Sequence, residues 1–167
     1  MFDTSYTLQQ IAEATGFSSE RVRYVIDQKI MPGQRKSGAI QVGSRGRGKA
    51  RRYIAFEAFS IACATAMIGA GLRRKTVREC FDLICSYTRP GSRNVQDMPL
   101  YQAFERDVAM LEIGDHVNVR IHGSADYRKR KLDFGWRQIE TGAALGDDYE
   151  PTVIVGINVA KIRKSIR

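Results

Sequence analysis

The fold of the N-terminal half is decided by residues 7–28, which read TLQQIAEATGFSSERVRYVIDQ. Thr7 and Gln10 have the spacing of a capping box, in which two side chains satisfy free backbone N–H groups at the start of a helix. Gly16 ends that helix, and Ser18 is typical of the residue that begins the next one. We therefore predict two short helices joined by a tight turn, which is a helix-turn-helix arrangement.

Helical patterns continue beyond this pair. The second helix, predicted from Ser19 to about Gln28, has its apolar residues on one side. Residues 55–70 are apolar on nearly all sides, as expected of a core helix, and residues 72–87 are amphipathic. The N-terminal half is therefore predicted to contain four helices.

Positive charge is concentrated in residues 33–53, which hold seven Lys or Arg, no Asp or Glu, and five glycines. Glycine at this density disfavours a helix, because each one costs ~1 kcal/mol relative to alanine. We predict a flexible basic hairpin or loop here, with a solvated linker as the alternative. Two smaller basic clusters, in residues 128–131 and 161–167, are either further binding surfaces or a charged loop and a solvated tail.

Whole-chain composition narrows the class of protein. The 167 residues carry 27 Lys and Arg against 18 Asp and Glu, a net charge of +9, which suits an anionic partner, either nucleic acid or a membrane surface. The hydrophobic fraction of 43% is that of a globular protein, and no apolar run is long enough to span a membrane. The first residues lack the pattern of a signal peptide, and the three cysteines suit a reducing compartment, so we expect a cytoplasmic protein.

A change of pattern follows the linker signal Arg89-Pro90-Gly91-Ser92. We therefore divide the chain into residues 1–88, a linker at 89–96, and a C-terminal segment at 97–167. In that segment, Leu100, Ala103, Phe104, Val108 and Leu111 follow Pro99 at helical spacing. Alternation of apolar and polar residues predicts strands over residues 117–122, about 132–139 and 152–159.

A series of short motifs occurs in order along residues 6–83: Tyr6-Thr7-Leu8-x-x-Ile11-Ala12, Thr15-Gly16-Phe17-Ser18, Val22-Arg23-Tyr24, Lys29-Ile30-Met31-Pro32, Arg51-Arg52-Tyr53, Gly69-Ala70-Gly71-Leu72 and Val77-Arg78. Their order and spacing resemble the winged helix-turn-helix DNA-binding domain of the MerR family. The resemblance implies that the second helix enters the major groove and that the basic segment is a wing on the flanking backbone. It also implies phosphate contacts from Arg51 and Tyr53.

The chain departs from that family in three ways, one of which is that Val25 stands where an aromatic residue often follows the family's Arg-Tyr. Its wing is longer and more basic, which suggests a more extended backbone contact. The family's long dimerisation helix is absent, so effector sensing and an antiparallel coiled coil are not carried over, and residues 97–167 resemble no family that we can name. The predicted fold class is α+β, a winged helix-turn-helix of four helices and a basic wing, followed by a small segment of helix plus antiparallel strands.

Candidate DNA-binding residues fall into two groups. In the second helix, the serines and arginines are expected to contact base edges, whereas Tyr24 and the residues of the basic segment are expected to contact phosphates. The alternatives are a capped, solvated helix and tyrosines packed at the edge of the core. The candidates are Ser18, Ser19, Arg21, Arg23 and Tyr24 in the first group, and Arg35, Lys36, Arg45, Arg47, Lys49, Arg51, Arg52 and Tyr53 in the second.

Other site chemistry finds little support in the sequence. Hydrolase, metalloprotease and phosphate-loop motifs are absent, so we expect neither an enzyme nor a cofactor. Cys63 falls in an apolar helix, while Cys80 and Cys85 lack the spacing of a metal-ligand pair. His116 and His122 lie too far apart on a straight strand to share an ion, so no metal site is expected.

Three functions remain open. The leading hypothesis is a sequence-specific, nucleoid-associated transcription regulator that binds double-stranded DNA. An excisionase-like protein that bends DNA for a recombinase would also suit a basic wing. The third is an adaptor or anti-activator that docks a protein partner through an acidic loop and exposed strand edges. Because high specificity usually needs two half-sites, we expect a homodimer formed by residues 97–167, through strand pairing or the face of Leu100, Phe104 and Val108.

Overall fold

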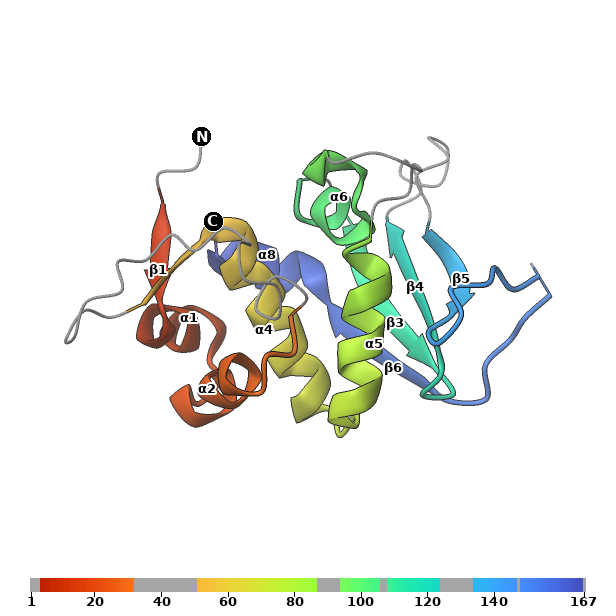
Figure 1. Ribbon diagram of the computed structural model, residues 1–167, viewed down its shortest axis with the longest axis horizontal. Helices are drawn as coiled ribbons and strands as arrows, with labels where there is room; N and C mark the ends of the chain where they lie inside the picture. Colours follow the sequence, from red (N-terminus) through yellow and green to blue (C-terminus); the bar gives the residue numbers. More distant parts are fainter. Residues whose placement is uncertain are drawn as a thin grey trace.

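The computed structural model describes residues 4–31, 51–86, 94–105, 108–123, 134–146 and 148–166. Over these residues the chain is α+β with two antiparallel sheets, which confirms the predicted class (Figure 1). The elements in order are β1 (Ser5–Thr7), α1 (Leu8–Thr15), α2 (Ser19–Asp27), β2 (Arg52–Ile54), α4 (Ala55–Gly69), α5 (Arg74–Ile84), the 3-10 helix η1 (Val95–Asp97), α6 (Pro99–Glu105), β3 (Val108–Gly114), β4 (Asn118–Gly123), β5 (Phe134–Gln138), β6 (Ile154–Asn158) and α8 (Val159–Ile166).

The first two helices begin and end where the sequence predicts. Thr7 Oγ1 accepts a hydrogen bond from Gln10 N at 3.2 Å, and Gln10 Oε1 accepts one from Thr7 N at 2.8 Å, which completes the capping box. Gly16 adopts the left-handed conformation with φ 74°, which an L side chain would strain. Ser18 Oγ then accepts from Arg21 N at 3.3 Å and caps α2.

Helix α4 is the centre of the core, and α1, α2, α5, α6 and α8 all contact it (Figure 1). Its side chains are buried on almost every side, as the sequence predicts, with Phe59, Cys63 and Met67 fully inaccessible to solvent. Each large apolar side chain buried in this way contributes about 1.5–3 kcal/mol of transfer free energy. The surrounding helices are therefore held in place mainly by their apolar faces against α4.

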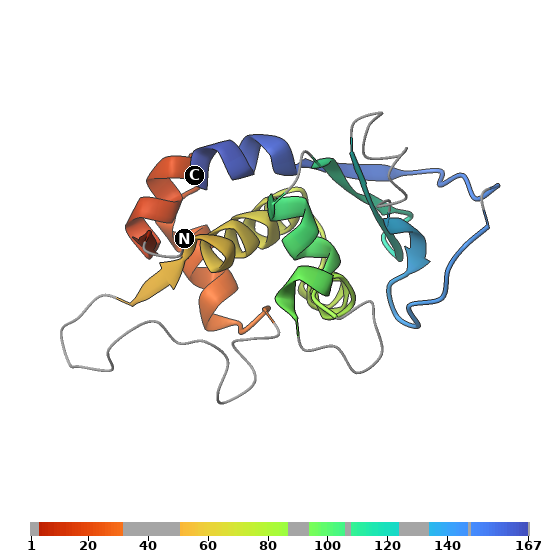
Figure 2. The ribbon, with the colours of Figure 1, turned by 90° about the horizontal axis from the view of Figure 1, so that it is seen from above.

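The larger sheet has the strand order β5-β4-β3-β6, and the described helices lie on one side of it (Figure 2). In the register, Leu111 of β3 lies between Ile121 of β4 and Ile157 of β6, and all three side chains are buried. Side chains of the opposite face include Glu112 and Arg120. One face of the sheet therefore completes the core, and the other is partly polar.

The helix predicted from Pro99 to Leu111 is wrong beyond Glu105, because residues 108–114 form β3 instead. Leu111 and Ile113 alternate with Glu112, and pairing with strands on both sides satisfies their backbone, so tertiary structure overrides the helical spacing. The apolar face proposed for dimerisation is also corrected. Leu100 and Phe104 are buried, and the ring centroid of Phe104 lies 5.3 Å from that of Phe59 in the same chain.

The strand predicted over residues 152–159 ends at Asn158, and the basic C-terminal residues form helix α8 rather than a tail. Val159, Ile162 and Ile166 are buried, and α8 contacts α1 and α4. The hydroxyl of Tyr6 donates a hydrogen bond to the Ile166 carbonyl, so the two ends of the chain meet. One buried cluster thus includes residues from both sides of the predicted linker, and the division of the chain at residues 89–96 stays a prediction.

Candidate nucleic-acid interface

Helix α2 presents one buried and one exposed face. Val22, Val25 and Ile26 are buried, and the helix packs against α1 and α4. Arg23 and Tyr24 lie on the exposed part, and 40% of Tyr24 is accessible. An exposed helix face beside a tight turn can approach the edges of base pairs, because an α-helix fits into the major groove.

The two serines at the start of α2 have partners within the chain. Ser18 accepts the hydrogen bond that caps the helix, and Ser19 Oγ donates to Gln9 Oε1 of α1 at 2.8 Å. Ser18 is exposed and Ser19 is partly buried. Both serines therefore form hydrogen bonds that stabilise the helix pair, and their contact with DNA stays a prediction.

Arg21 and Arg23 lie in different surroundings. A Cβ atom built on Gly69 would lie 3.5 Å from Arg21 Nη1, so the Arg21 guanidinium lies against the C-terminal end of α4. That end carries partial negative charge, which favours a cation there. Arg23 is exposed. We infer that Arg23 is the better placed of the two for a base contact.

The charges of α2 cancel, because Arg21 and Arg23 are matched by Glu20 and Asp27. A carboxylate near DNA repels phosphates, although it can accept a hydrogen bond from the amino group of cytosine. Attraction to the phosphate backbone must therefore come from residues around α2 rather than from α2 itself.

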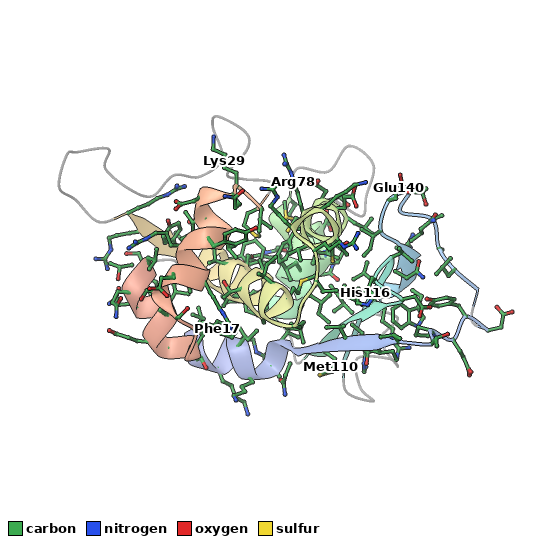
Figure 3. All side chains as sticks on the ribbon, turned by 90° about the horizontal axis from the view of Figure 1, so that it is seen from below. Phe17, Lys29, Arg78, Met110, His116 and Glu140 are labelled. Carbon is green, nitrogen blue, oxygen red and sulfur yellow. The ribbon has the colours of Figure 1, made fainter. Side chains whose placement is uncertain are left out.

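A basic surface beside α2, which the sequence patterns did not predict, supplies such charge. Arg73, Arg74, Lys75 and Arg78 of α5 are exposed, as is Lys29, which follows α2 with φ 49°. The Arg74 guanidinium donates to Gln28 Oε1 and so connects the start of α5 to the end of α2. Lys29 and Arg78 project on the same side of the molecule, opposite α8 (Figure 3).

The start of α5 is not arranged for helix stability. Arg73 occupies the N-cap position without a side-chain cap, and two further cations follow in the first turn. Cations are unfavourable at a helix N-terminus, where free N–H groups concentrate partial positive charge. The same features make such an end favourable for an anion. The signal was present in the sequence as the run Arg73-Arg74-Lys75 directly after Gly71-Leu72.

The residues around β2 divide between surface and core. Tyr53 is only 3% exposed, so its ring packs in the core, and burial raises the pKa of its hydroxyl. Arg52 Nε donates to Ser5 Oγ at 2.7 Å and Nη2 donates to the Ser5 carbonyl at 2.9 Å, which fastens β2 to β1. Arg51 is exposed, with its guanidinium 5.2 Å from the centroid of the Tyr53 ring. Tyr53 therefore packs in the core, which was the alternative to its predicted phosphate contact. Of Arg51, Arg52 and Tyr53, Arg51 is the best placed to contact a phosphate.

Five of the DNA-binding candidates lie outside the described residues, namely Arg35, Lys36, Arg45, Arg47 and Lys49.

Within the described part of the chain, no group of three or more His, Cys, Asp or Glu side chains could hold a metal ion. Burial raises the pKa of the Cys63 and Cys80 thiols, which keeps them protonated at neutral pH. No helix in the described ranges is long and apolar enough to cross a bilayer.

A second polar cluster lies on the outer face of the sheet. Arg120 Nε donates to Glu112 Oε2 at 2.5 Å, and His122 Nε2 lies 3.1 Å from Glu112 Oε1. Burial opposes ionisation of Glu112, but the hydrogen bond from Arg120 and the adjacent His122 outweigh it and lower its pKa. The Arg120 guanidinium also lies 4.7 Å from the Trp136 ring centroid. These contacts stabilise the sheet.

Comparison with known proteins adds no relative to this picture. No protein-family model matches the chain, and neither the curated proteins nor the solved structures contain a match.

Proposed function

We propose that this chain binds double-stranded DNA as a sequence-specific transcription regulator. Helix α2 enters the major groove, and the basic residues beside it contact the phosphates. The observation that carries the proposal is the position of the exposed face of α2, next to the cations of Lys29 and of α5 that Gln28 and Arg74 connect.

The two parts of this interface have different chemistry. Arg23 can donate two hydrogen bonds to a guanine edge, and Glu20 or Asp27 can accept from a cytosine amino group. Lys29, Arg73, Arg74, Lys75 and Arg78 are cations that suit phosphates, which are the same at every sequence. The basic segment at residues 33–53, which also follows α2 in the sequence, would add to the second part.

The test is a titration of labelled duplex DNA with the full chain between about 50 and 200 mM salt, over which phosphate-binding proteins lose affinity steeply. The double variant Lys29→Ala/Lys75→Ala should weaken binding to cognate and random DNA alike. It should also reduce the slope of log affinity against log salt by about 0.9 for each phosphate that the variant no longer neutralises.

Lys164→Ala is the matched control, because it removes an exposed lysine from α8, on the opposite side of the molecule. It should leave the slope unchanged when the variant and the wild type are compared in the same association state. Binding that is independent of salt in the wild type, or a control that weakens binding as much as the double variant, would contradict the proposed interface. Footprinting then separates a regulator, with one compact promoter site, from an excisionase-like protein with tandem sites beside an attachment sequence.

A further inference from the structure

The two edges of the four-stranded sheet differ in whether another segment of the chain covers them. The outer edge of β5 is covered by the segment that follows it, since Arg137 forms a β-bridge with Ala144 and Leu145 N donates to the Trp136 carbonyl at 3.0 Å. Strand β6 pairs with β3 on one side. On its other side, β6 pairs with no strand among the residues that the structure describes.

The open edge of β6 has hydrogen-bonding groups directed outward. The Val153 carbonyl accepts from Asp115 N at 2.8 Å, so the backbone of Val153 faces the side of β3. Hydrogen bonding alternates from one residue to the next along an antiparallel strand. Ile154 and Gly156 therefore direct their N–H and C=O groups toward the open edge, and Asn158, whose carbonyl begins the hydrogen bonding of α8, directs its N–H there.

Within the described residues, this edge lacks the charges, proline and bulge that commonly protect an exposed strand against pairing. Natural proteins place Lys, Pro or a bulge on exposed edge strands, because unpaired strands recruit other strands. Residues 152–160 contain no charged residue and no proline, and the register of β6 with β3 is regular. Val153 is 48% exposed and Ile154 is 49% exposed, so apolar side chains accompany the open backbone.

We propose that β6 pairs antiparallel with β6 of a second copy of this chain, around a twofold axis at Gly156. This register overlaps the full length of the strand and uses all three residues with outward hydrogen-bonding groups. It places Ile154 opposite Asn158 of the partner subunit and Val155 opposite the partner subunit's Ile157. Because Val155 and Ile157 lie on the core face, the two apolar sheet faces become continuous.

Charge favours a second copy over an unrelated strand. Asp148 and Glu150 are exposed just before β6, and Lys161 and Lys164 are exposed just after it on α8, which continues along the line of the strand (Figure 2). Antiparallel pairing brings the acidic end of one copy beside the basic end of the other, and it does so twice in a dimer. These attractions oppose the repulsion between two chains that each carry a net charge of +9.

The pairing uses no residue of the candidate nucleic-acid interface, so its test needs no DNA and is independent of the proposed function. The first experiment is the molar mass of the full chain by light scattering or sedimentation, from about 1 to about 100 µM, since association follows mass action. We expect twice the mass of one chain. A wild-type monomer throughout this range overturns the proposal, whether or not another protein supplies the covering strand.

The variant Ile154→Pro removes one outward N–H at the first residue of β6, where proline is tolerated, and leaves the pairing with β3 intact. It should weaken the dimer at least about tenfold, because the proline ring occupies the open edge where the partner strand must approach. Val117→Lys is the control, since it replaces another exposed apolar residue, 54% accessible, in the turn between β3 and β4. It should leave the mass unchanged. An Ile154→Pro dimer as tight as the wild type contradicts the proposal.

A charge exchange tests the orientation even if the proline variant fails to fold. Asp148→Lys/Glu150→Lys makes both ends of β6 basic, and Lys161→Glu/Lys164→Glu makes both ends acidic. Each variant alone should associate more weakly than the wild type, and an equimolar mixture should form a heterodimer. Variants that self-associate as tightly as the wild type, or a mixture that stays monomeric, would show that the copies do not pair in this way.

Discussion

Helices α2 and α8 are of similar length and both pack on α4, but their outer faces differ. The exposed face of α2 carries both signs of charge together with Tyr24, whereas the exposed residues of α8 are Lys161 and Lys164. Their inner faces are alike, since each buries three branched apolar side chains. The comparison separates two roles: the buried stripe determines where a helix lies, and the outer residues determine what it can bind.

The largest effect on stability is expected from deletion of the whole of α8. Val159, Ile162 and Ile166 together contribute about 5–9 kcal/mol by burial, which approaches the whole stability of a typical domain. We therefore expect deletion of residues 159–167 to leave the chain largely unfolded, as measured by circular dichroism and urea unfolding.

The fragment 1–88 extends the same test, because it lacks α6 and α8 but keeps α2. It should be much less stable than the whole chain. A fragment that unfolds cooperatively at the same urea concentration as the full chain would instead show that the N-terminal helices form an independent domain.

The next test compares one matched residue on each helix. Ile26 on α2 is 9% exposed and Ile162 on α8 is 8% exposed, so their burial is nearly equal. Replacing either with alanine should cost about 2–4 kcal/mol, because apolar burial is removed and a cavity remains. Urea midpoints measure both values. A cost for Ile162→Ala well under half that for Ile26→Ala would mean that α8 is held more loosely than its burial indicates.

The outer faces are compared by their effect on DNA recognition. Arg23→Ala should reduce discrimination between cognate and random duplex by about 1–3 kcal/mol if Arg23 makes one good base contact. Arg21→Ala should have less effect, because its guanidinium lies against α4. Lys164→Ala on α8 should have none when the variant and the wild type are compared in the same association state. Competition titrations measure the three variants, and equal effects for Arg21 and Arg23 would reject the assignment of the base contact to Arg23.

The smallest effect concerns the residues that begin the two helices. Ser18 Oγ accepts from Arg21 N in α2, and Asn158 Oδ1 accepts from Lys161 N at 2.8 Å in α8. Ser18→Ala and Asn158→Ala should each lower the free energy of unfolding by about 1 kcal/mol. Measurement at low protein concentration keeps association from contributing. If both substitutions left the free energy of unfolding unchanged, water would be shown to replace these capping hydrogen bonds.

The two helices also show what the sequence can predict. Helix α2 was predictable because Gly16 and Ser18 mark its boundary. Helix α8 was not, because the alternation that ends at Val159 runs into it without a turn. Strand β3 was missed for a similar reason, since Val108 and Leu111 fit helical spacing until their pairing with β4 and β6 is known.

The candidate site was predictable in part. The exposed position of Arg23 and Tyr24 follows from the period of α2. The basic start of α5 was visible as a charge run, but its position beside α2 depends on the contact between Gln28 and Arg74, which are far apart in the sequence. The burial of Tyr53 and the attachment of Arg52 to Ser5 also depend on a distant strand, β1.

The reactivity of the three cysteine thiols can be used to measure how often the helical core opens. Cys63 and Cys80 lie fully inside the packing of α4 and α5, whereas Cys85, at the end of α5, is partly accessible. An alkylating reagent consumes only thiolates that it can reach, so Cys85 should be modified first in the native chain. Modification of the other two then requires α4 and α5 to separate, and its rate reports how often the centre of the protein comes apart.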